Sequence, residues 1–200
     1  ISCHMPMTSF AQMNRTDHSM LPPTPAATLA YQSPNACNLC HSDKDAAWAD
    51  QLVREWRSRD YQAPLLIRAS LIDAARKRDW KRLPEMLDTI VGKNRDQIFA
   101  TSLIRMVTAS GDTRVVPVLL AAIKDPSPLV RAAAAEALQQ IFTKEADQAL
   151  VEAAGDDYRL VRVRAAASLA GRQPQELPLD EAQKQRLETA NEEYLASLLS

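Results

Sequence analysis

This chain of 200 residues has little glycine, few aromatic residues and almost no net charge. Its 4 glycines and 5% aromatic residues argue against a β-sandwich or β-barrel, because such folds use glycine in turns and aromatic residues in strands. The formal net charge of −1 offers no electrostatic basis for binding nucleic acid or an anionic membrane. The longest apolar run, residues 115–123, is too short to be a membrane span. A hydrophobic fraction of 46% is nevertheless enough for a folded core.

The chain is uneven in composition. All glycines follow residue 91, whereas every cysteine and histidine lies within the first 41 residues: Cys3, His4, His18, Cys37, Cys40 and His41. An odd number of cysteines cannot form a closed set of disulfides. Two segments of different chemistry are therefore joined in one chain.

Cys37, Cys40 and His41 form the motif C-x-x-C-H, the attachment signature of c-type haem. Two thiols at this spacing can form thioether bonds to the two vinyl groups of one haem. The adjacent histidine can then supply an axial nitrogen to the iron. The spacing predicts covalent haem c on Cys37 and Cys40, with His41 as the proximal iron ligand.

A partial signature stands at the start of the sequence. Cys3 and His4 are the end of a C-x-x-C-H motif whose first cysteine would precede Ile1. We therefore expect the chain to begin inside a haem motif, with Cys3 attached to a second haem and His4 bound to its iron. His18 belongs to no attachment motif, and we predict that it is the distal ligand of one of these irons; the alternative is a surface histidine.

Two other chemistries use the same residues. Cys37, Cys40 and His41 could hold zinc together with Cys3 or His4, although an adjacent cysteine and histidine rarely both reach one small ion. A redox-active dithiol of the thioredoxin kind would need a βαβ context, which this sequence lacks.

Residues 1–42 carry few charges and several prolines. Because proline removes amide donors and fixes φ, we expect neither long helices nor paired strands in this segment. An irregular, apolar segment of this kind is suited to wrapping a large flat cofactor, whose burial would supply the missing core.

From residue 43 onward the apolar residues recur with a helical period, and a repeat appears at an offset of 31 residues. Residues 125–138 align without a gap on residues 156–169, with seven identical pairs. We expect the apolar members, which include Leu129 and Leu160, to fall on one helical face. Ile98 occupies the same position in an earlier, fainter unit.

This segment resembles a HEAT-type α-solenoid with short units, over about residues 64–171. The pattern D-x-x-x-L-V-R-x-x-A-A-x-x-L carries the resemblance. It implies units of two helices and a turn. It also implies an arginine ladder, by which we mean a series of structural contacts between arginine and aspartate side chains that joins neighbouring units. Its members would be Asp125, Arg131, Asp156 and Arg162.

The predicted fold class is all-α, with an irregular haem-binding N-terminal segment followed by a HEAT-like α-solenoid of helix pairs. We divide the chain into a haem-binding segment truncated at its N-terminus (1–42), the helical repeats (43–171), and a linker with a C-terminal amphipathic helix (172–200).

Together the two halves are similar to bacterial multihaem c-type cytochromes that carry HEAT and then tetratricopeptide repeats. The residues that carry this similarity are Cys3 to Pro6, Asp17 to Ser19, Pro34 to His41, Asp43, Lys44 and Trp48. The resemblance implies a periplasmic protein with further haem domains in the same polypeptide and a redox partner protein.

The expected function is electron transfer by covalently bound haem, with the repeats docking a protein. One alternative is an interaction scaffold with a structural or sensory haem or metal segment. Another is a fragment of a multihaem oxidoreductase of the nitrogen-cycle type. We expect electron transfer rather than catalysis within this chain.

Overall fold

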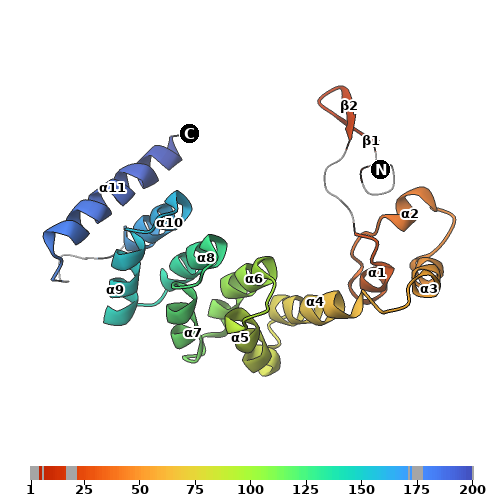
Figure 1. The fold of residues 1–200 in the computed structure, drawn as a ribbon, viewed down its shortest axis with the longest axis horizontal. Coiled ribbons are helices and arrows are strands. Elements are labelled where there is room, and N and C mark those ends of the chain that lie inside the picture. The colour runs from red at the N-terminus through yellow and green to blue at the C-terminus, as the bar shows by residue number, and fades with distance from the viewer. Residues whose placement is uncertain (1–4, 6, 17–21, 171, 173–177, 200) are drawn as a thin grey trace. The chain divides into compact units, whose positions relative to one another are not determined.

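The computed structural model describes residues 5, 7–16, 22–170, 172 and 178–199. Its contacts divide the chain into two compact units, Ile1–Asp73 and Ala74–Ser200 (Figure 1). The described residues are mainly helical, which confirms the predicted all-α class with HEAT-like repeats. These two units are defined by contacts between residues and not by composition. They therefore do not test the predicted segments 1–42, 43–171 and 172–200, which stay a prediction.

Unit 1 contains two short strands and a set of helices. Its described elements are β1 (Met7–Phe10), β2 (Met13–Thr16), α1 (Pro25–Tyr31), α2 (Cys37–Cys40) and α3 (Ala46–Trp56), and α4 (Ala63–Arg76) runs across the division into unit 2.

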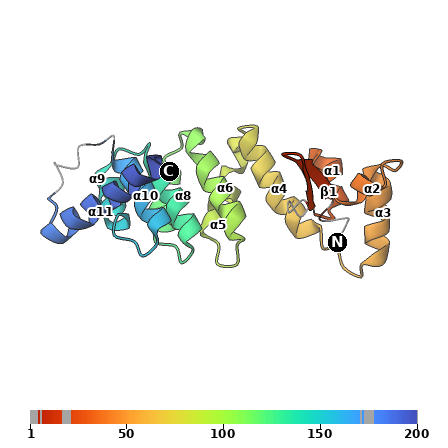
Figure 2. The same cartoon turned by 90° about the horizontal axis from the view of Figure 1, so that it is seen from above.

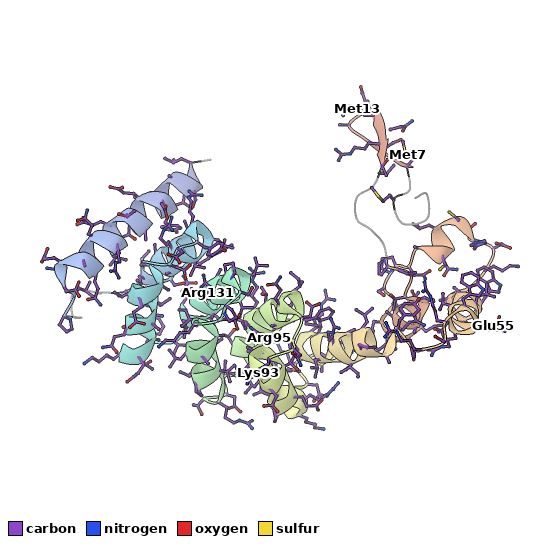
Figure 3. The ribbon with its side chains drawn as sticks, in the orientation of Figure 1. Met7, Met13, Glu55, Lys93, Arg95 and Arg131 are labelled. Carbon is purple, nitrogen blue, oxygen red and sulfur yellow. The ribbon has the colours of Figure 1, made fainter. Side chains whose placement is uncertain are left out.

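The two strands form an antiparallel hairpin, so the expectation of no paired strands is wrong here. Met7 pairs with Thr16, and Phe10 pairs with Met13. The stretch Met7–Thr16 contains no proline, so its amides remain available for pairing. Ala11 and Gln12 form the turn with φ of 48° and 63°, the left-handed values that a tight hairpin needs. Figure 3 marks Met7 and Met13 on this hairpin.

The rest of unit 1 is built on α1 and α3, which pack together through small residues. Ala26, Ala27, Ala49 and Val53 are buried. The side chain of Gln62 is also buried and joins three segments: its Oε1 accepts the Ala26 amide at 3.0 Å, and its Nε2 donates to an Asp50 carboxylate oxygen at 2.7 Å. A fully hydrogen-bonded buried amide fixes the relative position of these segments, because losing one partner would leave a polar group unpaired.

Unit 2 is an array of helix pairs. After a short 3-10 helix, η1 (Trp80–Arg82), come the pairs α5 (Leu83–Val91) with α6 (Gln97–Val107), α7 (Val115–Ala122) with α8 (Pro128–Leu138), and α9 (Lys144–Ala153) with α10 (Arg159–Leu169). A second 3-10 helix, η2 (Thr108–Ser110), follows α6, and α11 (Glu181–Leu198) follows the last of these pairs. Helices α6, α8, α10 and α11 contact one another in that order (Figure 2).

The helix ends are formed in different ways. Helix α3 is capped by Asp45, whose side chain accepts the Trp48 amide at 2.8 Å. Ser127 stands at the N-cap of α8, but its hydroxyl donates to Gln97 Oε1 at 2.6 Å and caps no amide of the helix. Of the three glycines within the described residues, only Gly111, after η2, has a positive φ.

Alanines dominate the contact between successive units. In α8, Ala133, Ala134 and Ala135 are fully buried, because small side chains let the neighbouring helices approach closely. The larger buried residues of α8 are Val130 and Leu138. The expectation that all apolar repeat positions share one face was too broad. Leu129 is 37% exposed, since it lies one residue, or about 100° of helix, away from Val130.

The predicted arginine ladder is confirmed. Arg131 donates from Nε and Nη2 to both carboxylate oxygens of Asp156, at 2.7 and 2.9 Å, and from Nη1 to the carbonyls of Asp125 and Pro126. One unit earlier, Arg95 pairs with the Asp125 carboxylate. Figure 3 marks Arg95 and Arg131 in successive units.

Helix α11 continues the ladder after α10. Arg162 donates to both carboxylate oxygens of Glu193, at 2.9 and 2.6 Å, and to the carbonyls of Asp156 and Asp157. These are the bonds that Arg131 makes, with Glu193 taking the role of the next aspartate. Yet Ala190 is the one buried residue in the described part of α11. The Arg162–Glu193 ion pair is therefore one of the main interactions that hold α11 against α10.

Replacing Arg131 by alanine is expected to lower the free energy of unfolding by roughly 2 kcal/mol. The change leaves the half-buried Asp156 carboxylate and two loop carbonyls without their donor. Urea unfolding followed by circular dichroism measures the loss. Arg105→Ala is the matched control, because its ion pair with Glu136 is longer and exposed, and we expect a loss below about 0.5 kcal/mol. Equal losses in the two variants would contradict the ladder.

Replacing Glu193 by glutamine is expected to make stability less sensitive to acid. The hydrogen bonds from Arg162 lower the Glu193 pKa in the folded chain, and burial opposes them only in part. A carboxyl with a lowered folded pKa stabilises the fold above its unfolded pKa of about 4.3 and loses that contribution as the pH falls. Glu193→Gln should therefore melt lower than the parent at about pH 7, with a smaller difference at about pH 3. The exposed neighbour Glu192→Gln should differ little at either pH.

Candidate functional site

The C-x-x-C-H motif forms a single helical turn, α2, that begins at one thiol and ends at the other. Cys37 is half-buried, whereas Cys40 and His41 are exposed. The His41 amide donates to the Cys37 carbonyl at 3.0 Å, and this bond closes the helical turn. Its ring lies against Trp48, with 4.9 Å between the ring centroids and 53° between the planes. The structure thus places Cys37, Cys40 and His41 on one short turn.

A buried asparagine holds this turn. Asn35 is only 3% exposed, and its Oδ1 accepts the amides of Cys37 and Asn38 at 3.0 and 3.2 Å. Its Nδ2 donates to the Thr28 hydroxyl in α1 and to Asn38 Oδ1. Asn38 in turn donates to the Lys44 carbonyl at 2.8 Å. A four-residue helix is too short to be stable by itself, so these bonds supply its order.

An apolar cavity of about 290 Å³ lies beside the motif, within unit 1. Cys37 and His41 border it on one side, and α3 supplies most of the remaining wall, including Trp48, Leu52 and Trp56. Trp56 is 71% exposed at the rim. An indole left in water beside an apolar cavity is unfavourable unless a ligand or partner covers it.

The polar groups around this cavity are held in place by hydrogen bonds. Burial raises the pKa of the Tyr61 phenol, and the neighbouring Cys37 thiol adds to the effect. The same phenol donates to the Pro23 carbonyl. Burial opposes ionisation of Asp60, but hydrogen bonds from Arg54 and two backbone amides outweigh it and lower the Asp60 pKa. Tyr61 is therefore neutral in the cavity wall, whereas Asp60 lies outside the wall and its charge is balanced by Arg54.

The remaining predicted site residues, Cys3, His4 and His18, lie outside the described residues. Within the described ranges, no three His, Cys, Asp or Glu side chains gather closely enough to hold a metal ion. The zinc alternative would use Cys3 or His4, so it is not tested by the described residues.

A second candidate surface lies on the repeat array. Ile98, Leu129 and Leu160 occur at the same position of successive units, 31 residues apart, and are 57%, 37% and 44% exposed. They stand in the first turn of α6, α8 and α10. A repeated aliphatic position that stays in contact with water is typical of a face that binds another protein.

The residues that support the motif differ in how far the sequence indicates them. Asn35 stands two residues before Cys37, and an asparagine in that place favours a turn that caps the following amides, so the sequence does carry a signal for its role. The roles of Gln62 and Tyr61 could not be read, because their partners lie 36 and 38 residues earlier in the chain.

Residues 84–170 match the family model of HEAT repeats. The matched region covers α5 to α10 and agrees with the array described above. No curated protein is similar enough to the sequence to count as a match. Among the described helices, none is both long and apolar enough to cross a membrane. The fold is thus that of a HEAT-like helical repeat protein, which suggests a protein-interaction scaffold and protein partners.

Replacing Asn35 by alanine is expected to loosen the motif without unfolding unit 2. The variant loses the oxygen that accepts the Cys37 and Asn38 amides. A buried amide without a hydrogen-bond partner lowers the local free energy of unfolding by roughly 1–3 kcal/mol. Hydrogen exchange measured by mass spectrometry should show faster exchange in residues 37–44 and unchanged exchange in α8. Ser42→Ala, an exposed change beside the motif, is the control. Unchanged exchange in the Asn35 variant would contradict the supporting role.

Proposed function

We propose that this chain is part of a periplasmic multihaem c-type cytochrome that transfers electrons and uses its HEAT-like repeats to dock a protein. Cys37 and Cys40 attach haem c, and His41 binds its iron. Cys3 and His4 belong to a second haem site, and His18 is a distal ligand. The observation that carries the proposal is the apolar cavity bordered by both Cys37 and His41.

The side chains present fit a haem. A porphyrin is flat and apolar with a polar edge, and the cavity wall is formed by Trp48, Leu52 and Val53. Cys37 and His41 both line this space, so one group placed there would contact both residues. Cys40 is exposed at the far end of α2 and is free to form the second thioether.

Each residue of the site has a task that its environment supports. When bound, haem supplies reversible one-electron oxidation and reduction at its iron. Trp48 restrains the His41 ring through their direct contact. Asn35 and Asn38 fix the turn, so that both thiols are presented from one rigid element. Trp48 and Trp56 supply apolar surface against which the haem would pack.

The repeat array supports the docking part of the proposal. HEAT-like units form extended surfaces, and here the row of Ile98, Leu129 and Leu160 offers aliphatic contacts in three successive units. A haem protein that transfers electrons needs a partner held close to it. The periplasm is proposed because covalent haem attachment is typical of that compartment, and further haem domains would belong to the same polypeptide.

Maturation of the full chain with the c-type haem attachment machinery is expected to add one haem to the tryptic peptide 16–44. This peptide contains Cys37, Cys40 and His41 but not Cys3. Intact mass and peptide mass measure the addition, and the visible spectrum reports the iron ligands. The double change Cys37→Ser and Cys40→Ser should abolish haem on this peptide, and His41→Ala should remove the low-spin spectrum.

Cys3→Ser is the matched control and should keep the haem on peptide 16–44. His18→Ala should change the low-spin spectrum, and an unchanged spectrum would assign His18 to the surface. Absence of covalent haem on Cys37 and Cys40 in the parent chain would overturn the cytochrome proposal. The interaction scaffold would then be the better account, because the exposed aliphatic row does not depend on haem.

A further inference from the structure

One cationic side chain stands at the edge of the apolar cavity. Helix α3 ends at Trp56, and the next residue, Arg57, has an extended backbone with φ −118° and ψ 127°. This turn brings Arg57 to the cavity wall, where it is the only lysine, arginine or acidic residue among the lining residues. An arginine at the edge of an otherwise apolar cavity indicates a ligand with an apolar body and an anionic edge.

The nearby carboxylates are already paired with another arginine. Arg54 donates to Asp50 at 2.7 Å and to Asp60 at 3.1 Å. Asp60 Oδ1 also accepts two backbone amides at the start of α4. In the part of the chain that the structure describes, no carboxylate forms an ion pair with Arg57. Its guanidinium instead lies over the Tyr61 ring, 5.6 Å from the centroid.

We propose that Arg57 binds a carboxylate of the flat ligand held in this cavity, which is a propionate of the haem on Cys37 and Cys40. This inference rests on the proposed function and adds a polar anchor to it. His41 and the two thiols would hold the haem from α2, whereas Arg57 would hold a carboxylate of it from the end of α3.

The geometry suits this role. A guanidinium is planar and presents paired N–H donors that match the two oxygens of a carboxylate. The Tyr61 ring restrains Arg57 by a cation–π contact, and Tyr61 is itself held by its hydrogen bond to Pro23. Arg57 therefore loses less conformational freedom on binding than an unrestrained surface arginine would.

The test uses the full chain produced without haem attachment. Its probes are protoporphyrin IX, which lacks iron and so cannot use His41 as a ligand, and the dimethyl ester of the same porphyrin, which lacks the carboxylates. Binding is followed by quenching of tryptophan fluorescence, since Trp48 and Trp56 line the cavity. We expect the parent chain to bind the diacid more tightly than the diester.

Arg57→Gln is expected to weaken binding of the diacid roughly three- to fivefold and to leave binding of the diester unchanged. Arg57→Lys should keep most of the preference, because it keeps the charge. Arg59→Gln is the matched control: Arg59 is exposed two residues further on and is not part of the cavity wall. It should behave as the parent chain does.

An unchanged ratio of diacid to diester affinity in Arg57→Gln would overturn the role of Arg57. Failure of the parent chain to bind either porphyrin would overturn it as well. Neither result decides the proposed function, because haem attachment is measured separately by the mass of peptide 16–44. Covalent haem on that peptide together with an unchanged affinity ratio would therefore reject the anchor alone.

Discussion

The bidentate pairing of an arginine with an acidic residue of the following unit is the interaction on which the repeat array depends. Arg131 joins its own loop carbonyls to Asp156, and Arg162 repeats those bonds with Glu193. Alanine contacts between units are apolar and tolerate sliding, whereas two parallel charge-assisted bonds fix direction and register. The ion pairs thus set how successive units are oriented, and apolar burial supplies the driving force.

Unit 1 is stabilised by a different means. Helices α1 and α2 are short, several of its buried residues are alanines, and buried amide side chains make the connections that specify its arrangement. Gln62 joins α1 to α3, and Asn35 joins α1 to the motif turn. Satisfied polar groups of this kind give a defined geometry with little apolar area. The apolar cavity and the exposed Trp56 lie beside them, so apolar surface of this unit stays open to water.

The repeat array could be predicted well because its signals are local and periodic. The 31-residue offset located α8 and α10, and the resemblance to HEAT repeats implied the ladder through Arg131 and Asp156. The exposure of Leu129 was not predicted, since neighbouring apolar residues on a helix cannot be assigned to core or surface without the position of the next unit.

The N-terminal segment was harder to predict. The strand pair at Met7–Thr16 was not expected because proline content was judged over the whole segment. The cavity wall depends on contacts between α3 and residues far away in sequence, so the motif indicated the chemistry but not its surroundings.

The equivalence of Arg131 and Arg162 has a consequence for how this architecture can change. A unit that begins at Asp125 and one that begins at Asp156 offer the same bonding groups at both ends, so their junctions are interchangeable. Inserting or deleting a whole 31-residue unit would preserve each junction, whereas a partial insertion would leave an arginine facing the wrong residue. Helix α11 shows that this junction also accepts a helix of another kind, because its Glu193 offers a carboxylate where the next aspartate would stand. The arginine of a unit can therefore bond to a neighbour that is not itself a repeat.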